Sequence, residues 1–157
     1  MLARGLATAA VVAILDQLSK AAVLAFFGGR VPGDRETVTP FFNLALTYNR
    51  GISFGLFNGG AGLNAVFFSL AAAAIIVVLV FWLSRVSSPF LAIAIGLIIG
   101  GAVGNVIDRI RLGAVVDFLD FHVGYLHWPA FNLADSAICI GVAAMLLDGL
   151  LLRREAH

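Results

Sequence analysis

The sequence has little charge, and this shortage excludes whole classes of protein. Only 12% of the 157 residues are charged, whereas 61% are hydrophobic; an ordinary soluble domain has about 25% charged residues. A chain of this composition cannot cover a soluble surface, so we expect a polytopic membrane protein. The formal net charge of +1 argues against a nucleic-acid partner, which would require a basic face.

Cysteine and histidine are equally scarce. The single cysteine, Cys139, cannot form an intrachain disulfide or a cysteine metal cluster. The three histidines, His122, His127 and His157, have no metal-ligand spacing such as HExxH. We therefore expect no metal and no cofactor.

Long apolar stretches dominate what is present. At about 1.5 Å per residue a helix of some 20 residues crosses a ~30 Å hydrocarbon core. The predicted fold is an α-helical polytopic membrane protein, a single domain over residues 1–157, with polar loops at residues 28–62 and 107–131. The four predicted transmembrane helices lie at residues 6–27, 63–83, 90–106 and 132–152.

The sequence leaves open whether the first stretch spans the membrane and which side of the membrane holds the termini. The first could instead be a signal peptide, with Arg4 as its n-region and Leu6–Leu15 as its h-region, although the apolar pattern continues past Lys20 to Phe27. An even number of spans places both termini on one side. Arginines flank both sides in nearly equal number, so the positive-inside rule favours cytoplasmic termini only weakly.

The first loop has strand periodicity. Between residues 42 and 49 apolar side chains alternate with smaller or polar ones, and residues 52–56 alternate again. This pattern predicts two short strands that lie on the membrane surface as a small sheet. An irregular interfacial loop is the alternative interpretation.

Two features inside the spans indicate close helix packing. Gly96, Gly100 and Gly104 recur every four residues and form a small face on which another helix can approach. Asp16 and Lys20 lie one turn apart in the first span, so they share a helix face and can pair. Charges inside a membrane are unfavourable, and we interpret these two as a structural polar pair, with direct participation in chemistry as the alternative.

The remaining polar side chains cluster between residues 104 and 135, and Asp117 and Asp135 are the candidate pair. Asn132 is a typical N-cap residue and Asp135 falls in the first helical turn, so capping alone could explain them. Asp117 could likewise be an interfacial acid paired with Arg109 or Arg111. If the two aspartates meet, they cannot both ionise easily, and one carboxylate and one carboxylic acid are what an aspartic hydrolase needs.

Spacing alone leaves this pairing open. Asp108 and Asp120 are competing acids, the first with Arg109 beside it as a ready partner and the second expected to point elsewhere. Cys139 follows Asp135 by one turn and could face the same way, but a lone thiol is usually a small buried filler.

Five motifs occur in a fixed order and carry a resemblance. The motifs are DQLSK from Asp16, NRGISFG from Asn49, GGAVGNVIDR from Gly100, GAVVDF from Gly113 and PAFNLAD from Pro129. With these motifs the chain is similar to the lipoprotein signal peptidase (signal peptidase II) family over nearly its whole length.

The resemblance implies four transmembrane helices, a small extracytoplasmic β-sheet cradle and a membrane aspartyl endopeptidase. Such an enzyme removes the signal peptide from diacylglyceryl-modified prolipoproteins, just before the lipidated cysteine. The substrate supplies that cysteine, so Cys139 is not implicated. The resemblance places the catalytic roles on Asp117 and Asp135. Substrate-binding or dyad-positioning roles fall on Asn49, Gly101, Asn105, Arg109 and Asn132.

The resemblance also implies the surroundings of the enzyme. It implies a bacterial cytoplasmic (inner) membrane location, cytoplasmic termini and an active site at the extracytoplasmic face. Expected partners are diacylated prolipoproteins, membrane lipid and globomycin-type cyclic peptide inhibitors, and we expect a monomer. Ile52-Ser53 departs from the Ala-Ala or Ala-Ser of many members and puts the fine shape of that loop in doubt.

Two other classes of function remain as alternatives. A proton-coupled transporter subunit would distribute ionisable residues through its spans, but residues 63–83 contain none. A non-enzymatic membrane scaffold would tolerate replacement of both aspartates.

Overall fold

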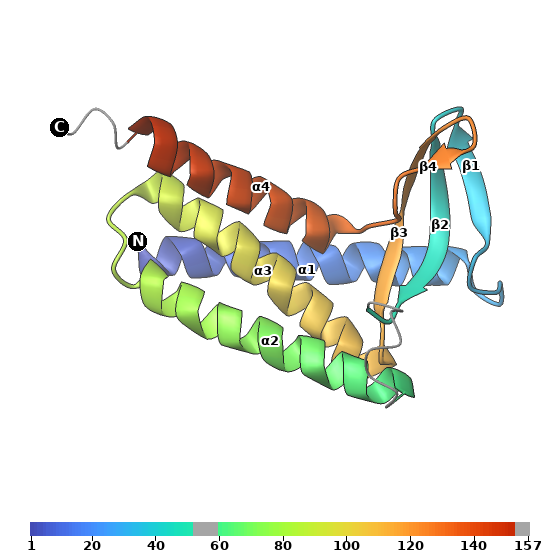
Figure 1. Cartoon of the computed structure of the whole chain (residues 1–157), viewed down its shortest axis with the longest axis horizontal. Helices are drawn as coiled ribbons and strands as arrows, with labels where there is room; N and C mark the ends of the chain where they lie inside the picture. The colour runs from blue at the N-terminus through green and yellow to red at the C-terminus, as the bar shows by residue number, and fades with distance from the viewer. Residues whose placement is uncertain (52–59, 153–157) are drawn as a thin grey trace.

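The computed structural model describes residues 1–51 and 60–152 and contains a helical bundle with a small sheet at one end (Figure 1). The N-terminus and the end of α4 lie at the opposite end of the bundle from the sheet. The helices are α1 (Leu2–Phe26), α2 (Gly60–Leu83), α3 (Pro89–Leu112) and α4 (Leu133–Leu147), and α4 continues as a π-helical turn over Asp148–Leu152.

All four helices are long and apolar enough to cross a membrane. Their outer faces expose large apolar side chains such as Leu70 and Val77, which suits contact with lipid rather than water. The prediction of four spans is therefore confirmed, although the ends differ. The first helix begins at Leu2 rather than at residue 6 and packs along α3, which favours the spanning interpretation over a signal peptide.

The third helix continues six residues beyond its predicted end at residue 106. It begins at Ser88, whose side chain accepts the Leu91 N–H, with Pro89 at its first turn, and it ends at Gly113 in the left-handed conformation (φ 70°). The charged segment 108–111 does not stop the helix, because Asp108 is ion-paired and arginines are favourable at a helix C-terminus. Asp108 and Arg109 are thus helical, not loop, residues.

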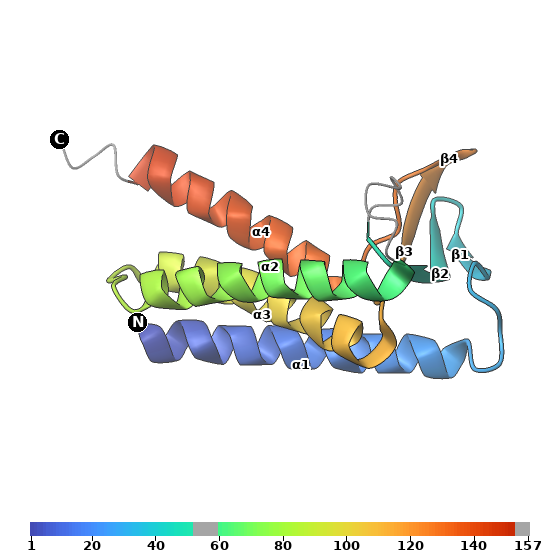
Figure 2. The same cartoon turned by 60° about the horizontal axis from the view of Figure 1, so that its bottom comes forward.

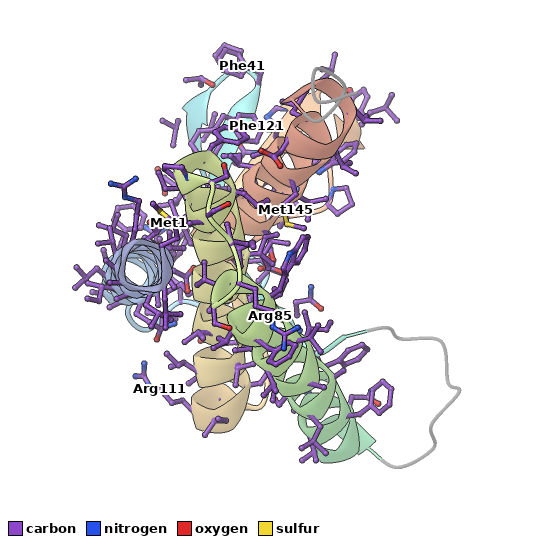
Figure 3. The ribbon with its side chains drawn as sticks, turned by 90° about the vertical axis from the view of Figure 1, so that its left-hand side faces the viewer. Met1, Phe41, Arg85, Arg111, Phe121 and Met145 are labelled. Atoms are coloured by element: carbon purple, nitrogen blue, oxygen red, sulfur yellow. The ribbon has the colours of Figure 1, made fainter. Side chains whose placement is uncertain are left out.

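Helix α3 is the centre of the bundle and packs against the other three helices. Viewed end-on in Figure 3, it lies between α1 on one side and α2 and α4 on the other. Glycines allow these approaches: a Cβ at Gly96 or Gly100 would meet α1 backbone, and one at Gly104 would meet the Asp16 side chain. The predicted close-packing face is confirmed, and its partner is α1.

The sheet is antiparallel with the order β1–β2–β3–β4. The predicted strand over residues 42–49 is confirmed as β2, and the expected strand over residues 52–56 lies outside the described residues. Strands β1, β3 and β4 were not predicted. The strands are β1 (Arg35–Thr39), β2 (Phe42–Asn49), β3 (Val115–Val123) and β4 (Leu126–His127).

Apolar contacts fix the sheet to the end of α1. Val23 of α1 and Phe27, which caps the end of α1, pack with Leu46 of β2 and Phe118 of β3 in one buried cluster. Figure 2 shows the sheet lying across the helix ends, while α4 diverges from α1 and α2 away from the sheet. The sheet therefore has a fixed position over the start of α4, where the candidate residues lie.

Candidate active site

Asp135 is held in the first turn of α4 by a capping box. The Asn132 side chain accepts the Asp135 N–H at 2.9 Å, and the Asp135 carboxylate accepts the Asn132 N–H at 3.2 Å. The predicted N-cap is therefore confirmed. The second carboxylate oxygen of Asp135 accepts a hydrogen bond from Asn105 Nδ2 on α3 at 2.8 Å.

Asp117 reaches the same place from β3. The left-handed Gly113 turns the chain from α3 into β3, and Asp117 is almost fully buried. Asn132 Nδ2 donates to Asp117 Oδ1 at 2.7 Å and Asn49 Nδ2 donates to Asp117 Oδ2 at 3.0 Å. Asn49 comes from the neighbouring strand β2, and its own Oδ1 accepts the Gly51 N–H at 2.9 Å.

Asn132 joins the two aspartates directly. Its backbone N–H binds Asp135 and its side-chain amide binds Asp117, so the two carboxyl groups share one fully buried residue. The same amide also donates to Asn105 Oδ1 at 3.2 Å. The structure thus brings together the two aspartates and the three asparagines that the sequence predicted as site residues.

The electrostatics distinguish Asp117 from an ordinary surface acid. Burial raises the pKa of Asp117 from 3.8 to about 6, and the negative charge of Asp135 acts in the same direction. The hydrogen bonds from Asn49 and Asn132 partly oppose this rise, because they stabilise the ionised form. A pKa of about 6 lets Asp117 carry or release a proton close to neutral pH.

Arg109 lies near both aspartates without an ion pair to either among the described residues. Its Nη1 donates to the Asn105 carbonyl at 3.4 Å, and its guanidinium lies 5.7 Å from the centre of the Phe68 ring. Beside it is a pocket of about 310 Å³ lined by apolar side chains of α2, α3 and α4, with Asn105 and Arg109 as its polar residues. The interpretation of Asp117 as a partner of Arg109 or Arg111 is wrong for the described residues, because amides bind its carboxylate.

Gly101 lies at the crossing of α3 and α4. A Cβ at this position would collide with the Ala134 carbonyl oxygen and with the Ile138 side chain. Its contribution is to allow the first turn of α4, with Asp135, to approach α3.

Asp120 belongs to a separate cluster, as its spacing from Asp117 suggested. Asn43 Nδ2 donates to it at 3.0 Å, His127 Nδ1 lies 2.8 Å away and Arg35 Nε lies 3.4 Å away. Although burial raises the pKa of Asp120, these partners outweigh burial and hold it below its usual value.

Two smaller predictions are wrong. The partner of Asp108 is Lys20 of α1, at 2.8 Å, not the adjacent Arg109. Cys139 is exposed on α4 rather than a buried filler, because the outer surface of the bundle is apolar and accepts it.

The predicted polar pair is confirmed, and it is larger than predicted. Lys20 Nζ lies 2.9 Å from Asp16 Oδ2 and 2.8 Å from Asp108 Oδ2. Gln17 adds hydrogen bonds to both carboxylates, at 3.2 and 2.9 Å. Sequence reasoning missed Asp108 and Gln17; the available signal was that Asp108 falls one turn after Gly104 on the packing face of α3.

Four helices of membrane-spanning length and a sheet that closes over two linked carboxyl groups define a multi-pass membrane protein with a paired-aspartate site. No group of three or more histidine, cysteine, aspartate or glutamate side chains in the described ranges is arranged to hold a metal ion. The chain belongs to the signal peptidase II family: the family model "Signal peptidase (SPase) II" matches residues 8–151.

Similar proteins and structures agree with this membership. Proteins named lipoprotein signal peptidase are 43% identical in Janthinobacterium sp. (92% of this chain, 87% of the relative) and 46% identical in Paraburkholderia phymatum (95% and 89%). That of Aeromonas hydrophila is 49% identical (87% and 81%). Two solved structures described as bacterial membrane enzymes, both 32% identical, match with TM-scores of 0.80 (94% of this chain, 92% of that chain) and 0.75 (96% and 88%).

Proposed function

We propose that this protein is a membrane aspartic endopeptidase that removes the signal peptide from diacylglyceryl-modified prolipoproteins by cleaving before the lipidated cysteine. The observation that carries this proposal is the linkage of Asp117 and Asp135 through Asn132. The negative charge of Asp135 raises the pKa of Asp117, so one member of the pair can act as a base while the other acts as an acid.

In the mechanism we propose, the ionised member of the pair takes a proton from a water molecule as it attacks the scissile carbonyl carbon. The protonated member donates its proton to the carbonyl oxygen. When the tetrahedral intermediate collapses, the other member passes the proton that it took from water to the leaving amine, and the first member takes its proton back from the hydroxyl group. Burial favours Asp117 as the member that holds the proton. Asp135 lies at a helix N-terminus, where a negative charge is favourable, and we assign it the role of base.

A substrate anchored by lipid must reach this site from within the bilayer. Each methylene buried in the membrane contributes about 0.8 kcal/mol, so a diacylated cysteine does not leave it. The pocket between α2, α3 and α4 has an apolar wall and ends at Asn105 and Arg109. We infer that the acyl chains and the signal peptide enter by this route and that Arg109 positions the substrate backbone.

The family resemblance and the shape of the bundle support an orientation. The sheet, whose strand β3 carries Asp117, and the start of α4, which carries Asp135, lie at the opposite end of the bundle from the N-terminus and the end of α4 (Figure 1). We propose that this end faces the extracytoplasmic side of a bacterial inner membrane, with both termini in the cytoplasm. We also propose that the chain acts as a monomer over one domain and that globomycin-type cyclic peptides occupy the site.

The test uses the purified full-length protein in lipid with a diacylated prolipoprotein. We expect cleavage before the modified cysteine, and loss of cleavage in Asp117→Asn and in Asp135→Asn. Asp120→Asn is the matched control, because Asp120 is an equally buried acid of the same strand with separate partners. Full activity of either dyad variant would overturn the assignment of the dyad, whereas a wild type that fails to cleave would favour a scaffold or transporter function.

A further inference from the structure

Three charged side chains, Asp16, Lys20 and Asp108, are buried together between α1 and α3, with 2% exposure or less. The Lys20 ammonium lies within 2.9 Å of both carboxylates. Burying three charges is unfavourable unless each is paired and hydrogen-bonded. Holding two helices together does not require this, because glycines and apolar contacts already pack α1 against α3.

Each of the two buried carboxylates also accepts a hydrogen bond from the backbone next to one aspartate of the pair. Asp16 Oδ1 accepts the backbone N–H of Ala134 at 3.0 Å, and Ala134 immediately precedes Asp135. Asp108 Oδ2 accepts the backbone N–H of Val116 at 3.1 Å, and Val116 immediately precedes Asp117. One buried carboxylate therefore holds the backbone next to each aspartate of the pair.

Lys20 connects these two supports to each other and to the site. It binds both carboxylates, and it also donates to Asn105 Oδ1 at 3.1 Å. That bond orients the Asn105 amide, so its Nδ2 group points to Asp135. Charge-assisted bonds of this kind are shorter and stronger than neutral ones.

We propose that Asp16, Lys20 and Asp108 form a backbone clamp that fixes the spacing between Asp117 and Asp135. The three are positioning residues: within the described part of the chain none is hydrogen-bonded to either aspartate, and each contacts Ala134, Val116 or Asn105. The charge of Lys20 also lowers the pKa of Asp117. This inference rests on the proposed function for its catalytic consequence. The structural part of the inference states which carboxylate holds which backbone amide, and it can be tested without measuring activity.

Amide hydrogen exchange tests the structural part. Asp16→Ala should accelerate exchange at the Ala134 amide and leave the Val116 amide protected, whereas Asp108→Ala should do the reverse. Asn retains one carbonyl oxygen as an acceptor, so Asp16→Asn and Asp108→Asn should restore much of the protection. Equal acceleration at both amides in every variant, or none at either, would overturn the clamp.

Kinetics with a diacylated prolipoprotein test the catalytic part. Lys20→Met should lower kcat by roughly 100-fold, the loss expected when reacting groups are misplaced by about 1 Å, with KM changed less than about threefold. Asp108→Ala should also move the alkaline limb of the kcat–pH profile, because Asp117, the proposed acid, would shift relative to its amide donors.

Leu83→Ala is the control for a merely structural effect. Leu83 is fully buried in the apolar core cluster with Leu91 and Ile95, so this variant should lower the melting temperature but keep the wild-type pH profile. Clamp variants that behave like Leu83→Ala, with normal kcat per folded molecule, would refute the positioning role. A wild-type protein that does not cleave would refute the proposed function. The hydrogen-exchange results would then still show whether the backbone clamp exists.

Discussion

Replacing Asp117 with asparagine should abolish cleavage and yet stabilise the fold at pH 8. Its pKa is 3.8 in the unfolded chain and about 6 in the folded protein. The ionised carboxylate is therefore less favourable in the folded state, and stability is lost as the pH rises from about 4 through 6. At about 1.4 kcal/mol per pH unit, this rise corresponds to an upper limit of about 3 kcal/mol that the neutral asparagine would recover.

The hydrogen bonds of the site reduce this gain. Asn49 and Asn132 both donate to Asp117, whereas an asparagine has one acceptor oxygen and would face one of them with its own N–H₂ group. The lost bond costs about 1–2 kcal/mol, which leaves a net stabilisation of about 1–2 kcal/mol at pH 8. For a chain of this size the melting temperature should rise by roughly 2–8 °C.

Thermal unfolding in detergent at pH 8 and pH 4.5 measures this effect. The advantage of Asp117→Asn should be present at pH 8 and disappear or reverse at pH 4.5, where the wild-type carboxyl is protonated. Asp120→Asn is the control of opposite sign, because partners hold the pKa of Asp120 low and its charge therefore stabilises the fold above that pKa. Destabilisation by Asp117→Asn at pH 8, equal to that of Asp120→Asn, would refute the reasoning.

Three further outcomes follow from the same contacts. Asn49→Ala removes a donor that lowers the pKa of Asp117, so Asp117, the proposed acid, should keep its proton to higher pH and the alkaline limb of the kcat–pH profile should move upward. The Cβ added by Gly101→Ala should collide with the Ala134 carbonyl, lowering the free energy of unfolding by about 1–3 kcal/mol in thermal unfolding and removing most of the activity in the cleavage assay. Gly149 has open space around it, so Gly149→Ala should change neither quantity. Cleavage should persist in excess chelator, and its loss there would count against a purely aspartic mechanism.

Local patterns were sufficient for the helices and for β2. Hydropathy over about 20 residues located all four spans, strand period located residues 42–49, and the Asn132 cap was evident from residue type. Each of these depends on neighbouring residues in the sequence, so no knowledge of the tertiary fold was needed.

Long-range contacts decided the rest. Asp108 was expected to pair with its neighbour Arg109, but its partners Gln17 and Lys20 come from α1, 91 residues away in the case of Gln17. Strand β3 was not recognised, because polar and apolar residues do not alternate regularly over Val115–Val123. The aspartate pair itself could not be derived from spacing, since Asp117 and Asp135 meet through an asparagine that binds both.

There is a physical reason why amide side chains, rather than cations, contact the aspartate pair. A cation in direct contact with both aspartates would favour ionisation of both and leave no acid for the leaving group. An amide donor stabilises a carboxylate more weakly, so a protonated and an ionised form remain accessible near neutral pH. Lys20 is accordingly kept one residue away: Asn105 accepts its hydrogen bond with Oδ1 and donates to Asp135 with Nδ2. The buried ammonium thus orders the site while an amide, rather than the charge itself, contacts the aspartate.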